Sequence, residues 1–342
     1  MMSEKKKIKN DVISQQRGIL MGISIILIIV FHFTEDCETF AFHYDGWVKW
    51  FRMYIGSSSV DAFLFLSGLG LYYSMKKNPD VRSFYKRRLT KILIPYTLVA
   101  LPAWILRDLV VKPAGVWNFV RDFTFLSFKD GEKWYWYIVM ILICYLIFPY
   151  IFQIVGNAKD SIEGEMYLLI LVGVFTVLLL GLKLFSKGEV YSNVEIALTR
   201  FPIFAAGAFY GRSSYEQRES YWKWGVILGV CVLALYLFPG NMPILGRYIR
   251  GLLNVSVCAL LAVLFSKAKL CVLKKILGWF GTHSLELYLT HVTVRKMMSA
   301  CGFATCHYRY ELIMVAIALF SAWLLAIVCA KLQSLLIKRV QA

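Results

Sequence analysis

A histidine stands near the far end of the first apolar run of the chain. Between Arg17 and His32 the sequence carries no charge. A helix rises about 1.5 Å per residue, so His32 is expected roughly 22 Å from the helix start, deep in a hydrocarbon core of about 30 Å. An imidazole at that depth needs a polar partner or a chemical role. Taken alone, the residue leaves two interpretations open: a neutral ring hydrogen-bonded at the outer interface, or a functional ring.

Three further ionisable residues are expected at a similar depth. Asp61 opens the second apolar run, His291 lies in the ninth, and Arg200 is placed about 9 Å below the outer end of the sixth by helical rise. Four such residues at one level indicate a polar cavity in the outer half of a bundle. Glu286 falls nearer the midplane, where a carboxyl group needs a cationic partner or a proton.

A basic pair, Arg88 and Lys91, lies one helical turn apart at the start of the third apolar run. A guanidinium makes bidentate contacts with phosphate oxygens and an ammonium adds a point charge, so the pair can hold phosphate. The other interpretation is a positive-inside anchor, which the spacing alone favours.

The elements that must position these residues are transmembrane helices. Hydrophobic residues make up 59% of 342, with 24 Phe, 20 Tyr and 10 Trp, too much apolar surface for a soluble globule. We therefore expect an all-α, polytopic membrane bundle. The formal net charge of +17 is placed in short loops between apolar runs, which argues against nucleic acid as a partner. No cysteine–histidine spacing resembles a metal site.

About ten apolar runs are long enough to span a membrane. They cover approximately residues 17–34, 59–75, 89–110, 134–155, 166–185, 194–210, 221–239, 251–267, 276–298 and 311–330. Pro95 and Pro102 are expected to interrupt the third run, and Arg200-Phe201-Pro202 the sixth.

Loop charges predict the orientation. Basic residues alternate between loops so that both termini are expected in the cytoplasm of a multi-pass plasma (inner) membrane protein. The exception is residues 107–133, where several cations would lie outside, offset by acidic neighbours; residues 117–128 are expected to form an amphipathic surface segment. The predicted organisation is a basic cytoplasmic segment, residues 1–16, then a transmembrane domain, residues 17–335, with no soluble domain.

Six short motifs follow one another along the chain. They are Gly22 with His32; residues 60–68, ending in Ser67-Gly68; residues 88–96, ending in Pro95-Tyr96; Trp136-Tyr137 followed by Tyr145 and Pro149; residues 200–207; and Gly278 to Ser284, Tyr288 and His291. In this order they resemble the acyltransferase 3 family of integral-membrane acyltransferases, over approximately residues 15–330.

This resemblance implies transfer of an acyl group, usually acetyl from cytoplasmic acetyl-CoA, to a hydroxyl of a cell-envelope polysaccharide, glycolipid or related acceptor. It implies His32 as the main catalytic residue and Arg88 with Lys91 as the site of the donor's phosphates. Acyl-CoA is then a donor substrate rather than a tightly bound cofactor. The expected partners are acyl-CoA, the hydroxyl acceptor, membrane lipid and a separate acceptor-side protein.

The residues themselves fit such chemistry. A neutral imidazole at His32 can take the proton of a sugar hydroxyl as it attacks a thioester. From their depth, Asp61 is expected to orient that ring, and Arg200 or His291 to stabilise the developing oxyanion.

Two positions depart from the family pattern. An arginine usually stands about eleven residues before the histidine, where this chain has Met21; Arg17, one turn earlier, is expected to take part in donor binding instead. The second family arginine at the third-run entrance is Lys91, which keeps the charge and loses the bidentate fork. A transporter or flippase for an anionic or sugar substrate is the alternative, because intramembrane charges and broken helices suit it as well.

Overall fold

The computed structural model describes residues 11–39, 59–186, 188–216, 222–238, 243–302 and 308–341, and every regular element in this part of the chain is helical. This confirms the all-α prediction. The elements are α1 (Val12–Gln15), α2 (Arg17–Thr39), α4 (Ser59–Lys77), α5 (Val81–Ile105), η2 (Leu106–Val111), α6 (Val116–Phe123), η3 (Leu126–Asp130), α7 (Trp136–Asn157), α8 (Ser161–Phe185), α9 (Glu189–Leu198), α10 (Phe201–Tyr215), α11 (Trp222–Leu237), α12 (Pro243–Lys267), α13 (Cys271–Thr282), α14 (Ser284–Ala300) and α15 (Tyr308–Gln341).

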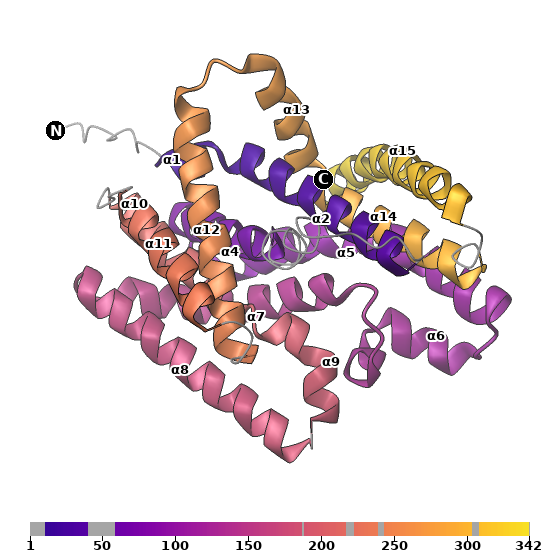
Figure 1. Cartoon of the computed structure of the whole chain (residues 1–342), viewed down its shortest axis with the longest axis horizontal. Coiled ribbons are helices and arrows are strands. Elements are labelled where there is room, and N and C mark those ends of the chain that lie inside the picture. Colours follow the sequence, from indigo (N-terminus) through magenta and orange to yellow (C-terminus); the bar gives the residue numbers. More distant parts are fainter. Residues whose placement is uncertain are drawn as a thin grey trace.

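Five helical segments are long and apolar enough to cross a membrane: Val81–Val111, Trp136–Asn157, Ile162–Phe185, Ile244–Lys267 and Ala316–Leu336. Two shorter apolar stretches are Arg17–His32 and Lys223–Leu237. Helices α8 and α15 lie along opposite edges of the bundle (Figure 1) and carry many exposed apolar side chains, among them Leu169, Val177 and Phe320. Apolar surface on this scale is suited to lipid rather than water, so the chain is a membrane protein.

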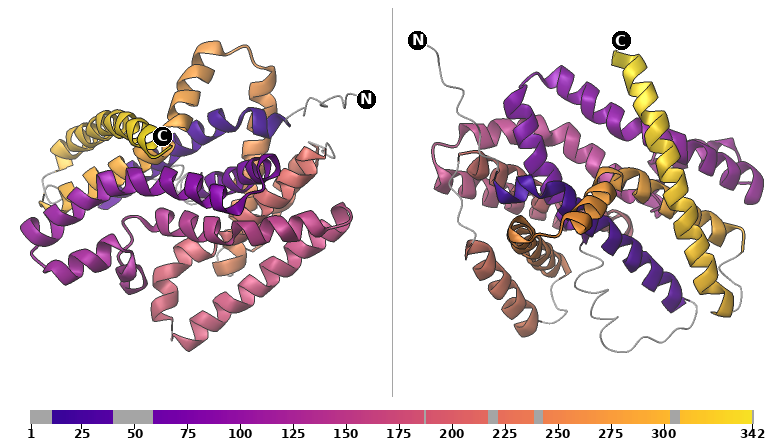
Figure 2. Two further views of the ribbon diagram at one scale, coloured as in Figure 1. Left: turned by 180° about the vertical axis from the view of Figure 1, so that it is seen from behind. Right: turned by 90° about the horizontal axis from the view of Figure 1, so that it is seen from above.

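Helices α2 and α13 touch backbone to backbone. A Cβ atom on Gly22 would collide with the carbonyl oxygen of Leu277, and one on Gly281 would collide with the carbonyl oxygen of Gly18. Figure 2 shows the two helices crossing when the molecule is seen from above. Small residues let membrane helices approach this closely because no side chain separates the backbones.

A second crossing joins α4 to α10. A Cβ on Gly68 would strike the carbonyl oxygen of Phe204, and one on Gly207 would strike that of Phe65. In both crossings the paired helices run in the same direction, since contacting residue numbers rise together along them. Two residues that follow or precede the crossing glycines by the same number of positions, one on each helix, therefore lie at the same height along the helix pair.

The predicted break in the third run does not occur: α5 continues through Pro95 and Pro102 to Ile105 and ends in a π-helical turn, η2. Proline lacks an N–H and so frees the carbonyl four residues earlier. At Pro95 that carbonyl belongs to Lys91, and the Gln333 side chain on α15 donates a hydrogen bond to it over 3.1 Å. A neighbouring helix thus replaces the lost bond, as membrane bundles allow.

The other breaks lie at polar residues. The predicted break in the sixth run is present, because α9 ends at Leu198 and α10 begins at Phe201 with Pro202 in its first turn. The ninth run, expected to be continuous, divides at His283 between α13 and α14.

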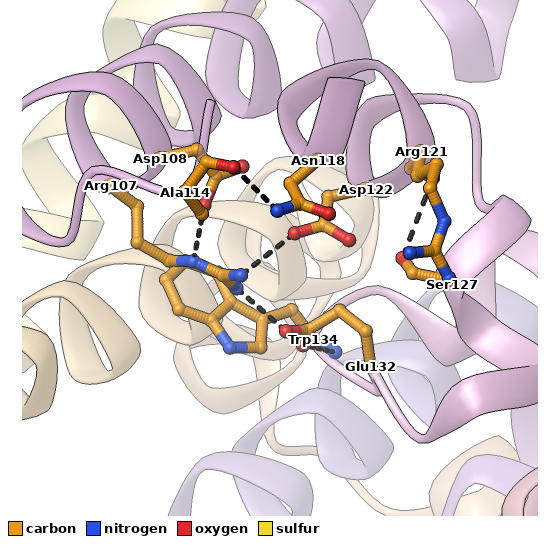
Figure 3. A network of polar contacts seen from close by, with 9 residues as sticks. All are labelled: Arg107, Asp108, Ala114, Asn118, Arg121, Asp122, Ser127, Glu132 and Trp134. Carbon is orange, nitrogen blue, oxygen red and sulfur yellow. Dashed lines mark hydrogen bonds and ion pairs between the residues drawn. The ribbon is translucent and has the colours of Figure 1, made fainter. Parts of the chain in front are cut away.

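The exceptional basic segment, residues 107–133, pairs three of its cations with its own carboxylates. Arg107 lies at the centre of Figure 3 and pairs with Asp108, Asp122 and Glu132 at 2.6–2.7 Å. Its guanidinium also lies over the Trp104 and Trp134 rings, 4.4 and 5.0 Å from their centroids. The first part of the predicted amphipathic segment forms α6, a short helix with an exposed Trp117 and a buried Asp122 side chain.

Two more cations of this segment share one carboxylate. Arg121 and Lys129 both pair with Asp130, and hydrogen bonds from Lys129 and Arg121 hold the pKa of Asp130 below its usual range.

Gly22→Ala is expected to destabilise the fold by about 1–3 kcal/mol, because the added methyl group forces α2 away from α13. Gly18→Ala is the matched control, since its Cβ would meet nothing within 4 Å. Alanine also favours helix by about 1 kcal/mol over glycine, so the control should be neutral or slightly stabilising. Unfolding of the two variants in detergent measures the difference; equal stability would contradict the backbone contact.

Candidate active site

The two histidines form a hydrogen-bonded pair between α2 and α14. Nδ1 of His291 lies 2.7 Å from the carbonyl oxygen of Leu287, and because a carbonyl oxygen only accepts, this nitrogen carries the N–H. Nε2 of a neutral His291 then holds a lone pair and accepts from Nδ1 of His32, 2.9 Å away. His32 consequently keeps its own lone pair on Nε2, where it is available to remove a proton.

A second contact locks the same two helices. Arg295 donates to Glu35 over 2.6 Å, one turn beyond the histidine pair on both helices. The histidines lie ten residues beyond Gly22 and Gly281, so the α2–α13 crossing brings both rings to one level. This matched spacing places the ring centroids of His32 and His291 5.1 Å apart.

Asp61 and Arg200 form a buried ion pair, with Nε 3.1 Å from Oδ1. Both residues are almost fully buried, at 1% and 3% exposure. Arg200 also donates to the Ile196 carbonyl oxygen and lies over the Trp136 ring, 4.9 Å from its centroid. Each partner lies seven residues before a crossing glycine, Gly68 or Gly207, so the α4–α10 contact positions this pair.

The structure thus sorts the four residues predicted at one depth into two pairs. His32 meets His291, and Asp61 meets Arg200 rather than the His32 ring. A single cavity lined by all four was expected, and none of the four is among the described residues that line the large cavity of the bundle.

That cavity has a volume of about 1010 Å³ and runs between two parts of the bundle. At one part, called here the basic end, it is lined by Arg17, Lys86, Arg87, Arg88, Lys91, Gln333 and Ser334. At the other, called here the inner end, it is lined by Ile25, Ile28, Val60, Phe63, Tyr137 and Tyr288. Ile28 and Tyr288 each lie about one helical turn before a histidine of the pair, so the cavity reaches to within about one helical turn of the pair.

Three residues predicted to bind the donor, Arg17, Arg88 and Lys91, meet at the basic end. Arg17 turns toward α4, where its Nε donates to the Leu66 carbonyl oxygen over 3.0 Å. It fits there because Gly70 has no side chain; a Cβ at that position would lie 3.0 Å from the guanidinium carbon. Met21 lines the same cavity. Arg17 therefore reaches the cavity that an arginine at position 21 would face.

The charge at the basic end is unbalanced. Five cationic side chains line the cavity there, and Glu286 is the carboxylate among the described lining residues. Glu286 is buried within electrostatic range of Lys91 and His283. Nε of Arg88 is buried and has no protein hydrogen-bond partner in the described part of the chain. An unsatisfied buried donor beside several cations is suited to an anionic ligand.

Sequence reasoning gave no role to several residues of this site. Gln333 and Ser334 lie on α15, far along the chain, and no nearby sequence pattern predicts that they line the cavity. Tyr288 stands one turn before His291 on the same helix, so its spacing predicts a position close to the histidine. Among the described residues no group of three His, Cys, Asp or Glu is arranged to hold a metal ion.

The described site thus joins a buried histidine pair to a deep, cation-lined cavity. The chain matches the family described as an acyltransferase domain (Acyl_transf_3) over residues 19–337. The match covers nearly the whole sequence, so the chain belongs to the acyltransferase 3 family, as its motifs predicted. No curated protein and no solved structure matches it.

Removing one partner of the Asp61–Arg200 pair is expected to destabilise the fold by about 3–5 kcal/mol, because a buried charge loses its counter-ion. Asp61→Asn tests this with little change of shape. Asp130→Asn is the matched control, since Asp130 is exposed and surface ion pairs such as those it makes with Arg121 and Lys129 contribute little to stability. Thermal unfolding in detergent compares the two; an Asp61→Asn variant as stable as the control would show that the buried pair is not needed.

Proposed function

We propose that this membrane acyltransferase takes an acyl group, most simply acetyl, from acyl-CoA and transfers it to a hydroxyl of an envelope polysaccharide, glycolipid or related acceptor. One observation carries the proposal: a single cavity leads from a cluster of five cations to the underside of a histidine pair. Its volume lies at the upper end of the range for small-molecule pockets, about 300–1,000 Å³, as a nucleotide thioester requires.

The two ends of the cavity match the two ends of such a donor. The phosphates of CoA carry several negative charges, which suit Arg17, Arg88 and Lys91. The pantetheine arm and acyl group are less polar and suit the inner end, where Ile25, Ile28 and other apolar side chains form the wall. Bound in this direction, the thioester lies next to the histidine pair.

His32 acts as the general base in this proposal. Its Nε2 takes the proton of the acceptor hydroxyl as the oxygen attacks the thioester carbonyl. The imidazolium that forms keeps its Nδ1–H bond to His291, and His291 is held in turn by the Leu287 carbonyl oxygen. The two hydrogen bonds, His32 to His291 and His291 to Leu287, can therefore remain in place both before and after His32 takes up the proton.

The same proposal sets the topology. We place ten helical segments across the plasma (inner) membrane, with both termini and the basic end in the cytoplasm, where acyl-CoA is made. The directions of α2, α4, α10 and α14 support this, since α2 and α14 run from the basic end toward the histidines while α4 and α10 run back. A hydroxyl acceptor then approaches His32 from the opposite side, alone or with a separate partner protein.

Arg88→Gln is expected to raise the Kd for CoA about 10- to 100-fold, because the cavity loses a charge-assisted contact to phosphate. Arg82→Gln is the matched control: it removes the same charge from the same helix at an exposed position away from the cavity. Titration of each purified variant with CoA measures the effect. Equal affinities would count against a phosphate site at the basic end and in favour of an anchoring role.

His32→Ala is expected to lower acyl transfer by about 10²- to 10⁴-fold, the usual range for loss of a general base. The assay follows label from radiolabelled acetyl-CoA into the membranes of cells that make the protein. His291→Leu should lower the rate less, because His32 keeps Nε2 and loses only its acceptor. Undiminished transfer by an inserted His32→Ala protein would refute the role of His32.

A further inference from the structure

A buried tyrosine hydroxyl at the inner end of the cavity has no assigned role. Tyr288 on α14 is 4% exposed. Its buried hydroxyl makes no hydrogen bond of full geometry in the described part of the chain, and the Tyr137 backbone lies near it. The residue nevertheless lines the cavity. Buried hydroxyl groups are normally paired, so one left unpaired at the wall of a cavity points to a ligand that pairs with it.

The ring of Tyr288 is held firmly in place. It packs edge-to-face on Tyr137, with centroids 5.2 Å apart, and lies 5.9 Å from the His291 ring. Tyr137 packs in turn against Phe63 at 6.2 Å. These three aromatic residues together line the inner end, so the Tyr288 ring is held beside the histidine pair at the wall of the cavity.

Acyl transfer needs a donor at this place. Attack on a thioester turns its carbonyl oxygen into an oxyanion, which hydrogen-bond donors stabilise strongly in a site without water. His291 and Arg200, whose depth suggested that they stabilise the oxyanion, already have other partners. His291 uses its N–H on the Leu287 carbonyl oxygen and its lone pair on His32, and the Arg200 guanidinium binds Asp61 and the Ile196 carbonyl oxygen.

We propose that the Tyr288 hydroxyl is the oxyanion donor of the acyltransferase, a catalytic role that rests on the proposed function. As the acceptor oxygen bonds to the carbonyl carbon, its proton passes to Nε2 of His32 and the carbonyl electron pair moves onto oxygen. Tyr288 donates a hydrogen bond to that oxyanion and keeps its proton. The C=O bond then re-forms, the C–S bond breaks, and the His32 imidazolium returns the proton to the sulfur, releasing CoA as the thiol.

The test is Tyr288→Phe, which removes one oxygen atom and keeps the ring that packs on Tyr137. The expected result is a fall of about 10²- to 10³-fold in the rate of label transfer from acetyl-CoA, as for loss of one oxyanion donor. The Kd for CoA and the thermal stability should stay near wild-type values, because free CoA lacks the thioester carbonyl and the hydroxyl makes no hydrogen bond of full geometry to the protein. Tyr191→Phe is the matched control, a buried tyrosine on α9 that does not line the cavity.

Each outcome has one meaning. A slow Tyr288→Phe enzyme with normal CoA affinity, beside a fully active Tyr191→Phe enzyme, supports the oxyanion role. Wild-type transfer by Tyr288→Phe, or a loss of CoA affinity or stability that accounts for the whole decrease in rate, overturns it. If the wild-type protein transfers no label, or His32→Ala transfers as much as wild type, the proposed function itself fails, and this is recognised before Tyr288 is considered.

Discussion

Direct contact between helix backbones at two glycine crossings determines the geometry of this protein. Gly22 with Gly281, and Gly68 with Gly207, leave no room for a side chain between their helices. Because each crossing joins helices that run the same way, it fixes register as well as distance. Both polar pairs of the bundle lie at matched intervals from these points: the histidines ten residues after one crossing, and Asp61 with Arg200 seven residues before the other.

The two pairs have different physical characters. The histidine pair is a chain of neutral hydrogen bonds that ends in a lone pair on His32, and a chain of this kind can accept a proton without rearrangement. The Asp61–Arg200 pair is a buried, compensated charge, which is costly to break and holds α4 against α10. The first pair is therefore suited to chemistry and the second to holding the bundle in the shape that the chemistry needs.

Much of this arrangement could be predicted from the sequence. Apolar periodicity gives the helices, and the depth argument correctly anticipated that His32 has His291 as a neighbour in height, because helical rise is nearly constant. Partner choice could not be predicted, since depth carries no information about rotation about the helix axis; Asp61 was assigned to His32 and lies on Arg200 instead.

The predicted break of α5 at proline was wrong, because a helix breaks there only if no distant side chain replaces the missing backbone hydrogen bond. Gln333 does so, and nothing near Pro95 in the sequence indicates it. Arg17 is the opposite case: the sequence suggested that it could replace an arginine at Met21, and the space above Gly70 shows how it reaches the cavity. Local chemistry was thus easier to predict than contacts between remote helices.

The bond from Gln333 to the Lys91 carbonyl oxygen has a consequence for biogenesis. Ala330, Gln333 and Ser334 form part of the cavity wall, yet a ribosome reaches them only after all the other lining residues have been made. Until α15 docks, the nascent bundle lacks this part of the cavity wall. Completion of the cavity is therefore a late folding event, separate in time from insertion of the helices that carry the histidines.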